Sequence, residues 1–315
     1  MNRILVIGGA GYVGTVLVNE LLKKNYKVTV YDLFIYGNNF TENPNLILEK
    51  GDVRDISKIK NIIKNNDIII HLACISNDPS FELNPKLGKE INLDCFEPLI
   101  NEAISSGIKK FIYASSSSVY GVKDTKNVTE EMKLEPLTDY SKFKAECENI
   151  LLSKSNDNFI CTVLRPATVC GYSPRQRLDL VVNILTNFAY FKNAITVYGG
   201  SQMRPNIHID DMVNAYICLL EEDTKKIKNQ IFNVGFENHS VLDLANLVKR
   251  NSKNKVSVNI QETDDNRSYH VSSSKILKTL KFKPKKNIDL AIKDLINAFE
   301  IKKLVNTFGN ENFFN

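Results

Sequence analysis

A tyrosine and a lysine one helical turn apart, Tyr140 and Lys144, follow a strand-like segment that ends in serines ("YASSSSVYG", 113–121). At helical spacing the two side chains share one face. A phenol is a poor base at its ordinary pKa of about 10, and a neighbouring ammonium brings that pKa towards neutral because it stabilises the phenolate. A serine hydroxyl opposite would orient an alcohol and share its proton. The combination suits removal of a proton from a secondary alcohol.

Loss of that proton from an alcohol accompanies loss of a hydride, and the N-terminal segment predicts where a hydride acceptor binds. The stretch "IGGAGYVGT" (7–15) follows a short apolar run and precedes a segment with helical periodicity. Glycines at a strand-to-helix turn let a pyrophosphate approach the amides of the helix N-terminus. We expect this turn to bind a dinucleotide through Gly8, Gly11, Tyr12 and Val13. The alternative is a tight turn that serves only strand–helix packing.

Two aspartates bear on which dinucleotide binds. Asp32 ends the second predicted strand, where a carboxylate accepts from the hydroxyls of the adenine ribose and repels a 2′-phosphate. No arginine follows in "DLFIYGNN" (32–39), so the sequence predicts NAD rather than NADP. The stretch "GDV" (51–53) closes the third predicted strand. We expect Asp52 and Val53 to lie at the adenine, with a solvent-facing turn aspartate as the alternative for Asp52.

Composition is that of a globular enzyme: the 315 residues are 43% apolar and 24% charged. Apolar runs stop short of a membrane span, and the N-terminus leaves no room for a signal-peptide core. The six cysteines are scattered without a C-x-x-C pair, as buried thiols are in a reducing compartment. We therefore expect a cytoplasmic protein with no membrane partner.

Charge and histidine spacing narrow the class further. The net charge is +5, with lysines gathered in "KFKPKK" (281–286). Only one aromatic residue, Phe282, stands among these lysines, so a solvated lysine face is favoured over a nucleic-acid site. The four histidines lie far apart in no ligand spacing, so no metal site is predicted.

The elements that must position these residues alternate between strand and helix patterns. Strands are expected at 3–7, 27–32, 46–52, 67–73, 110–118 and 159–164, and helices at 14–24, 85–107, 140–154 and 208–222. Apolar strands that alternate with helices imply a parallel sheet covered on both faces. The sequence therefore predicts an α/β fold of the Rossmann type, a doubly wound parallel sheet with a smaller C-terminal lobe.

The alternation loosens beyond Pro166, where Gly, Pro and Arg become frequent. We assign residues 1–172 and about 206–234 to an NAD-binding domain. Residues from about 173 to 205 and from 235 to 315 are assigned to a substrate-binding lobe.

The motifs fall in a recognisable order and spacing. They are the glycine turn, Asp32, "GDVRD" (51–55), "HLA" (71–73), "SSSSVYG" (115–121), Tyr140 with Lys144, "LRPATVCG" (164–171) and "RPNIHIDD" (204–211). From about residue 3 to residue 300 the chain resembles the extended short-chain dehydrogenase/reductases, and among them the nucleotide-sugar epimerase/dehydratase family.

The resemblance implies roles for individual residues on the cofactor side. Counted back from "VYG", the catalytic hydroxyl of the family falls on Ser116, which joins Tyr140 and Lys144. Lys144 would also hold the nicotinamide ribose. His71, Leu72 and Ala73 would line the nicotinamide side of the site.

The resemblance also implies a nucleotide-diphosphate sugar as substrate. Arg204 and, in looser spacing, Arg267 would clamp its diphosphate. Arg175 and Arg177 are predicted to contact the diphosphate or a decorated sugar, because bidentate guanidinium groups suit phosphate. The alternative for these two is a surface loop. The residues expected at the sugar itself are Ser116, Ser117 and Thr168.

Two departures from the family pattern limit the activity. The 4,6-dehydratases of the family carry an acid just after the catalytic hydroxyl, where this chain has Ser117 and Ser118, so dehydration is disfavoured. UDP-galactose-type epimerases read Arg-Tyr-Phe-Asn-Pro after the sixth strand. Here the stretch is "RPAT" (165–168), without the substrate asparagine, which argues against UDP-glucose.

The sequence thus predicts NAD-dependent oxidation at C4 of a nucleotide-activated sugar to a 4-keto sugar. Return of the hydride to the other face makes the enzyme a 4-epimerase, the first choice. A 4-dehydrogenase or a 4-ketoreductase would carry the same motifs. A non-catalytic NAD-sensing protein is the alternative from another class.

A homodimer is the expected assembly. Relatives dimerise through the helix that carries Asn92, which matches a family asparagine, and the helix that carries Tyr140. Ala103, Ala145 and Leu151 are candidate interface residues. Internal packing against the sheet would demand similar residues.

Overall fold

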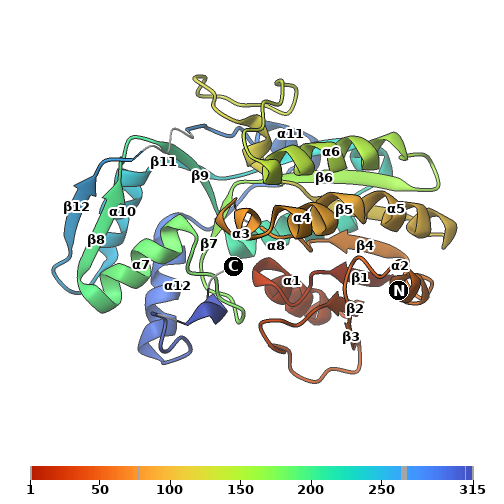
Figure 1. Ribbon diagram of the computed structural model, residues 1–315, viewed down its shortest axis with the longest axis horizontal. Coiled ribbons are helices and arrows are strands. Elements are labelled where there is room, and N and C mark those ends of the chain that lie inside the picture. Colours follow the sequence, from red (N-terminus) through yellow and green to blue (C-terminus); the bar gives the residue numbers. More distant parts are fainter. Residues whose placement is uncertain (1, 77, 264–267, 309, 314–315) are drawn as a thin grey trace. The chain divides into compact units, whose positions relative to one another are not determined.

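In the computed structural model, which describes residues 2–76, 78–263, 268–308 and 310–313, seven strands form one sheet in the order β10-β6-β5-β4-β1-β2-β3 (Figure 1). The strands are β1 Arg3–Ile7, β2 Lys27–Asp32, β3 Leu46–Lys50, β4 Ile68–His71, β5 Lys110–Ala114, β6 Ile160–Pro166 and β10 Gln230–Val234. Strands β1 to β6 pair in parallel. Their order reverses between β1 and β4, which confirms the predicted doubly wound Rossmann-type sheet.

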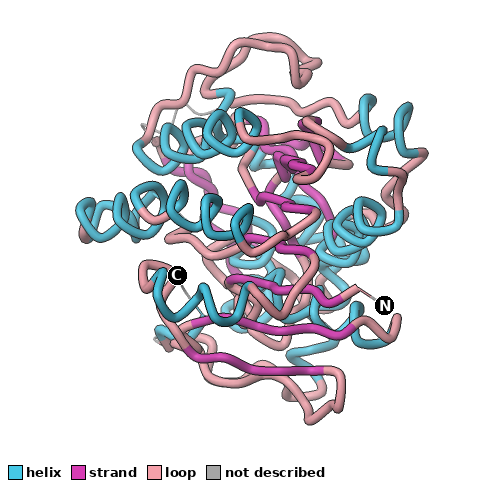
Figure 2. Tube along the Cα trace, turned by 90° about the vertical axis from the view of Figure 1, so that its right-hand side faces the viewer, coloured by secondary structure: helices cyan, strands magenta, loops and turns pink. Residues whose placement is uncertain are grey.

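Helices cover both faces of this sheet (Figure 2). They are α1 Tyr12–Lys23, α2 Ile56–Ile63, α3 Asp78–Leu83, α4 Pro85–Lys89, the π-helical turn η1 Glu90–Asp94, α5 Phe96–Ser105, the 3-10 turn η2 Ser117–Tyr120, α6 Asp139–Ser153, α8 Ile209–Glu221 and α9 Thr224–Ile227. Side chains along β1 alternate between the two faces of the sheet. Leu5 and Ile7 pack into one buried cluster with α2, α5 and α6, and Ile4 and Val6 point to the opposite face.

Two candidate dimer residues belong to that buried cluster. Ala103 and Leu151 are 0% exposed and pack inside the layer formed by α2, α5 and α6. Internal packing therefore explains both side chains, and neither is available to a partner molecule. Ala145 is half-buried.

The long helix predicted over 85–107 is interrupted in its middle. The amide of Cys95 donates to the Glu90 carbonyl at 3.2 Å, which is the wide turn of a π-helix. Asn92 lies within this turn, and its side chain both accepts from the Ile75 amide and donates to the Ile75 carbonyl, each at 2.9 Å. A contact to the loop at Ile75 thus accompanies the break, and helical periodicity alone does not reveal it.

A second set of elements lies C-terminal to β6. Strands β11 Glu237–Ser240, β9 Met203–His208 and β7 Thr168–Cys170 form a three-stranded sheet in that order, and β8 Ala194–Tyr198 pairs in parallel with β12 Ser257–Gln261. The helices are α7 Val181–Lys192, α10 Val241–Asn251, α11 Ser274–Leu280, α12 Ile288–Glu300 and the 3-10 turn η3 Glu311–Phe313. Apolar faces of α7, α10 and α12 bury a core cluster together with β8.

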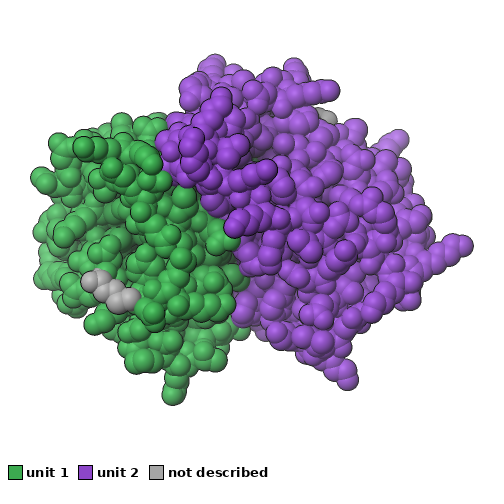
Figure 3. All heavy atoms as spheres, turned by 180° about the vertical axis from the view of Figure 1, so that it is seen from behind, with its two compact units in different colours: residues 1–119, 136–165, 213–232 green, residues 120–135, 166–212, 233–315 purple. Residues whose placement is uncertain are grey.

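The chain divides into two units (Figure 3). Unit 1 comprises residues 1–119, 136–165 and 213–232, and unit 2 comprises residues 120–135, 166–212 and 233–315. The expected first domain also included 120–135, 166–172, about 206–212 and 233–234, which lie in unit 2. All six cysteines are free thiols. Within the described ranges no helix combines the length and apolarity needed to cross a bilayer.

Asn233, at the end of β10, ties together three segments of unit 2. Its Oδ1 accepts from the Tyr120 hydroxyl at 2.7 Å, and its Nδ2 donates to the carbonyls of Val128 and Ser272 at 3.2 Å each. Its amide donates to the Glu130 carboxylate at 2.7 Å. Asn233 and Tyr120 are 0% exposed, so water cannot replace these bonds.

Replacement of Asn233 by alanine is expected to lower the free energy of unfolding by about 2–4 kcal/mol, because it removes three side-chain hydrogen bonds from a buried site. Urea denaturation measures the loss. Asn149→Ala, at an exposed position of α6, is the matched control and should change the free energy by less than about 0.5 kcal/mol. Equal effects of the two substitutions would contradict the role of Asn233.

Candidate active site

The glycine turn after β1 is shaped by close backbone packing. Gly8 has a φ of +80°, and a Cβ there would lie 2.4 Å from the Ala73 amide nitrogen. A Cβ on Gly14 would lie 2.6 Å from the Gly9 carbonyl. Packing therefore requires glycine at 8 and 14. At Gly11 the nearest atom is farther, 3.3 Å to the Gly8 carbonyl, so strand–helix packing explains this glycine least.

The N-terminus of α1 opens directly from this turn. Gly11 is its N-cap, no side chain caps the helix, and its first turn holds no acidic residue. The partial positive charge of the helix end is therefore not balanced by a carboxylate of the helix itself. The amides of Tyr12 and Val13 lie in this first turn, an arrangement that fits a pyrophosphate.

Asp32 is held beside the glycine turn. Its Oδ2 accepts from the Ala10 amide and its Oδ1 accepts from the Phe34 amide, each at 2.9 Å. These bonds fix the carboxylate at the carboxyl end of β2. A carboxylate is an acceptor that suits ribose hydroxyls.

The Asp52 carboxylate forms an ion pair with Arg54, two residues further along the chain. The Arg54 guanidinium donates to both carboxylate oxygens, with Nη2 2.7 Å from Oδ2, and it holds the pKa of Asp52 below its usual range. Arg54 also pairs with Glu90 at 2.8 Å. An adenine amino group would share the Asp52 carboxylate with this ion pair. Val53 is 7% exposed and belongs to the core cluster.

Tyr140 and Lys144 lie on α6, whose first turn is set by a capping box between Thr138 and Ser141. Tyr140 is half-buried, and Lys144 is 3% exposed. The Lys144 Nζ donates to the Ala114 carbonyl at 2.7 Å and lies 5.9 Å from the centroid of the Tyr140 ring. The structure therefore places a buried cation beside the phenol.

The serine run after β5 orders its own hydroxyls. Ser116 Oγ accepts from the Ser118 amide at 3.1 Å and from the Ser118 hydroxyl at 2.9 Å. Because both lone pairs are used, the Ser116 hydroxyl is set to donate its hydrogen. Ser117 is 2% exposed, whereas Ser118 is half-buried. Sequence reasoning missed the contribution of Ser118, for which the run of hydroxyls was the only signal.

His71, at the end of β4, is a neutral ring in an aromatic cluster. It stacks on Phe96 with centroids 5.5 Å apart, and it meets Phe111 edge-on and Tyr113 at a tilt. Burial, with a smaller effect of the Lys144 cation, lowers the pKa of His71 to about 3. Its Nδ1 has no hydrogen-bond partner among the described residues. The neighbouring Leu72 and Ala73 are half-buried, and their amides donate to the carbonyl of the last residue of β1.

The segment with Arg175 and Arg177 is built from buried amides. Asn183 accepts from the Gly171 amide at 3.0 Å and donates to the Arg177 carbonyl at 2.8 Å. Arg175 donates to the Gln176 carbonyl at 3.1 Å. The two arginines are 3% and 8% exposed, so the alternative of a surface loop is wrong.

The guanidinium of Arg177 is paired within its own segment. Its Nε donates to the Asp179 Oδ1 at 3.0 Å, and its Nη2 donates to the other carboxylate oxygen. Sequence reasoning missed this carboxylate, although it stands two residues away. This ion pair neutralises part of the positive charge that was expected to bind a diphosphate.

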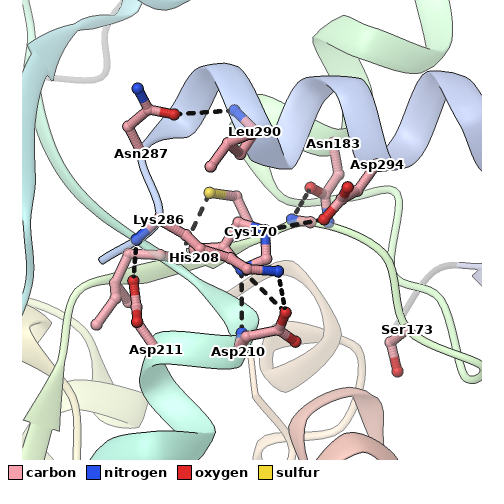
Figure 4. A network of polar contacts seen from close by, with 12 residues as sticks. Cys170, Ser173, Asn183, His208, Asp210, Asp211, Lys286, Asn287, Leu290 and Asp294 are labelled. Carbon is pink, nitrogen blue, oxygen red and sulfur yellow. Dashed lines mark hydrogen bonds and ion pairs between the residues drawn. The ribbon is translucent and has the colours of Figure 1, made fainter. Parts of the chain in front are cut away.

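Hydrogen bonds and ion pairs around His208 form a polar network near Asn183 (Figure 4). His208 is 2% exposed, and its Nδ1 accepts from the Asp210 amide at 3.1 Å, so its Nε2 carries the hydrogen that points to Asp294 at 3.1 Å. This hydrogen bond lowers the pKa of Asp294. Lys286 pairs with Asp210 at 2.6 Å. In the described part of the chain no cluster of three His, Cys, Asp or Glu could hold a metal.

The remaining predicted substrate residues lie on neighbouring strands of unit 2. Thr168 on β7 is in register with Asn206 on β9, two residues from Arg204. Thr168 and Arg204 are half-buried, and Arg204 donates to the Met203 carbonyl at 3.1 Å. Arg267 lies outside the described residues.

The predicted residues therefore separate by unit. Unit 1 gathers the glycine turn, Asp32, Ser116, Tyr140 and Lys144 after the carboxyl ends of parallel strands, where ligands of open α/β sheets bind. Unit 2 holds the substrate residues named above that follow β6.

The family follows from comparison with known proteins. A model of the NAD dependent epimerase/dehydratase family matches residues 4–235. The chain belongs to this family. It is therefore an NAD-dependent enzyme. The N-terminus of α1, the glycine turn after β1 and Asp32 fit the dinucleotide.

Individual relatives are distant. The UDP-glucose 4-epimerase of Lactobacillus helveticus is 26% identical over 268 residues, which cover 78% of this chain and 81% of that protein. The uncharacterized protein y4nG of Sinorhizobium fredii is 31% identical over 237 residues, which cover 75% of this chain but only 56% of y4nG. The structure of a UDP-N-acetylglucosamine 4-epimerase from Methanobrevibacter ruminantium M1 has a TM-score of 0.87 at 24% identity and covers 96% and 99% of the two chains.

Two glycines with nearly the same φ test the packing of the turn. Gly8 and Gly107 have φ of +80° and +81°, but a Cβ on Gly107 would meet nothing within 4 Å. Gly107→Ala should cost about 1–2 kcal/mol of left-handed strain. Gly8→Ala should cost about 2–4 kcal/mol more in urea denaturation and abolish NAD binding in calorimetric titration. Equal losses for both variants would contradict the clash with Ala73.

The buried ring of His71 predicts a pH dependence of stability. The unfolded histidine takes up a proton below its ordinary pKa of 6.5, whereas the folded one does so only near 3. The unfolded state therefore binds more protons between these values, and the free energy of unfolding falls as the pH is lowered through this window. Against His71→Gln, the excess slope should approach about 1.4 kcal/mol per pH unit in urea denaturation. Parallel slopes for the two proteins would show that His71 protonates when folded.

Proposed function

We propose that this protein is a nucleotide-sugar 4-epimerase, which oxidises C4 of the sugar and reduces it again from the other face. The observation that carries the proposal is the buried Lys144 ammonium, which lies beside the Tyr140 ring and donates to the carbonyl of Ala114, two residues before the Ser116 hydroxyl that is set to donate. The family and its 4-epimerase relative in Lactobacillus helveticus support the reaction class.

The cofactor-binding residues lie in unit 1. Gly8 and Gly11 leave room for the pyrophosphate at the N-terminus of α1, where the amides of Tyr12 and Val13 would bind it. Asp32 would accept from the adenine ribose, with Asp52 and Val53 at the adenine. The nicotinamide end would be held by Lys144, Leu72 and Ala73. When bound, NAD supplies the acceptor and later the donor of the C4 hydride.

The proton is handled by three side chains. Tyr140 takes the proton of the 4-hydroxyl as a phenolate, which the charge of Lys144 stabilises, and becomes a neutral phenol. Ser116 donates its hydrogen to the C4 oxygen, since Ser118 already occupies its lone pairs. Because the Ala114 carbonyl anchors Lys144, the cation stays in place while the tyrosine changes charge. Return of the proton from Tyr140 completes the reaction.

The substrate would be held mainly by unit 2. Arg175, Arg204 and Arg267 are proposed for the diphosphate, with Arg177 adding charge that Asp179 partly balances. The sugar itself would contact Ser116, Ser117 and Thr168. In this proposal residues 120–135 and 166–172 belong with the substrate-binding part.

Other outcomes use the same residues. Release of the 4-keto sugar would make the enzyme a 4-dehydrogenase, and the reverse half-reaction a 4-ketoreductase. A 4,6-dehydratase needs an acid beside the catalytic hydroxyl, and neither Ser117 nor Ser118 supplies one. A homodimer through the helices that carry Asn92 and Tyr140, located in the cytoplasm as its six free thiols favour, completes the proposal.

The decisive experiment incubates the purified protein with UDP-, GDP-, dTDP- and CDP-sugars and follows NADH absorbance and product stereochemistry together. Inversion at C4 without net NADH is expected for one nucleotide series. Tyr140→Phe should lower kcat by at least about 100-fold, because the phenylalanine accepts no proton. Lasting NADH would identify a dehydrogenase instead. Full activity of Tyr140→Phe would contradict the mechanism.

A further inference from the structure

The least exposed ion pair among the described residues of unit 1 takes no part in the reaction described above. Glu148 on α6 and Arg165 on β6 have side chains that are 2% and 3% exposed. Arg165 Nη2 donates to one carboxylate oxygen at 2.6 Å and Nε donates to the other at 3.0 Å. The contact is bidentate, so it fixes an orientation as well as a distance.

Ser115 is the third member of this group. Its hydroxyl donates to the same Glu148 carboxylate, and its side chain is buried. Its amide donates to the Leu164 carbonyl at 2.8 Å, one residue before Arg165. One carboxylate therefore joins α6 to the adjacent ends of β5 and β6.

The residue spacing along α6 places this junction on the same helix face as the proposed catalytic groups. Tyr140, Lys144 and Glu148 follow one another at intervals of four residues and share one helix face. Lys144 bonds the carbonyl of residue 114, and Glu148 bonds the hydroxyl of residue 115. The next residue is Ser116. The helix that carries the phenol thus contacts, residue by residue, the segment that carries the catalytic hydroxyl.

Arg165 also keeps two charges of the helix apart. Lys144 and Glu148 stand at i and i+4, a spacing at which they attract each other. Because Arg165 and Ser115 occupy both oxygens of Glu148, Lys144 is directed to the Ala114 carbonyl and the Tyr140 ring instead. Without Arg165 the ammonium would have a competing partner one turn away.

Stability alone does not account for the pair. Burial of two charges removes much of the gain from their attraction, and well-packed apolar residues often replace such pairs without loss of stability. What an apolar pair cannot do is hold the Ser115 hydroxyl or direct Lys144.

We propose that Glu148, Arg165 and Ser115 form a positioning clamp that sets Ser116 and Lys144 relative to Tyr140. The inference rests on the proposed function for the roles of these three groups. The clamp touches neither sugar nor cofactor in the proposed reaction; it acts through the groups that do.

A volume-conserving double variant separates positioning from stability. Glu148→Met with Arg165→Met should keep the urea midpoint near that of the wild type, while kcat falls about 10- to 100-fold with little change in KM. Ser115→Ala, which leaves the ion pair intact, should lower kcat in the same direction. The matched control is Glu97→Gln at the exposed pair of α6 with α5, whose Lys154–Glu97 distance is 3.1 Å, and it should alter neither quantity. A stable and fully active double variant would overturn the clamp.

A second readout does not depend on any sugar. The phenolate absorbance of Tyr140, obtained by subtracting the titration of Tyr140→Phe in the same background, should rise at higher pH in Ser115→Ala and in the double variant than in the wild type. If no sugar is turned over, the proposed function fails while this titration still decides the clamp. Unchanged phenolate titrations in folded variants would overturn it.

Discussion

The structure of the proposed site depends on one buried cation. The Lys144 ammonium has almost no contact with water, so it needs protein partners in place of solvent. The Ala114 carbonyl provides one, and the faces of Tyr113 and Tyr140 lie 4.9 and 5.9 Å away. A charge held this way stabilises a phenolate more strongly than a solvated lysine would, because the surrounding dielectric is low.

Other ionisable groups near this cation are neutral or paired. His71 is kept neutral by burial, and Glu148, one turn further along the same helix, is bound by Arg165. The chemistry of proton transfer is therefore left to one phenol and one amine. The same sheet carries the glycine turn and Asp32 after neighbouring parallel strands, so the cofactor features and the proton-handling groups share one rigid support.

The segment of unit 2 that carries Arg175 and Arg177 is held mainly by side-chain hydrogen bonds. Side-chain amides, chiefly those of Gln176 and Asn183, take over hydrogen bonds that regular secondary structure provides elsewhere. Such a segment can bury guanidinium groups without a surrounding sheet. Its cost is that each amide must find its partners, since a buried amide without them destabilises the fold.

The sequence by itself determined the parts of this protein whose physics is local. Strand and helix periodicity predicted the parallel sheet, and the glycine spacing, Asp32 and the four-residue step from Tyr140 to Lys144 predicted the cofactor turn and a cation beside a phenol. Only the tertiary structure decided which side chains meet across elements: Arg165 with Glu148, Asn92 with a preceding loop, and Asn183 with the arginine-bearing segment. The reason is that a turn or a helical face depends on residues within a few positions of one another, whereas the partner of a buried polar group depends on how separate elements and loops pack together.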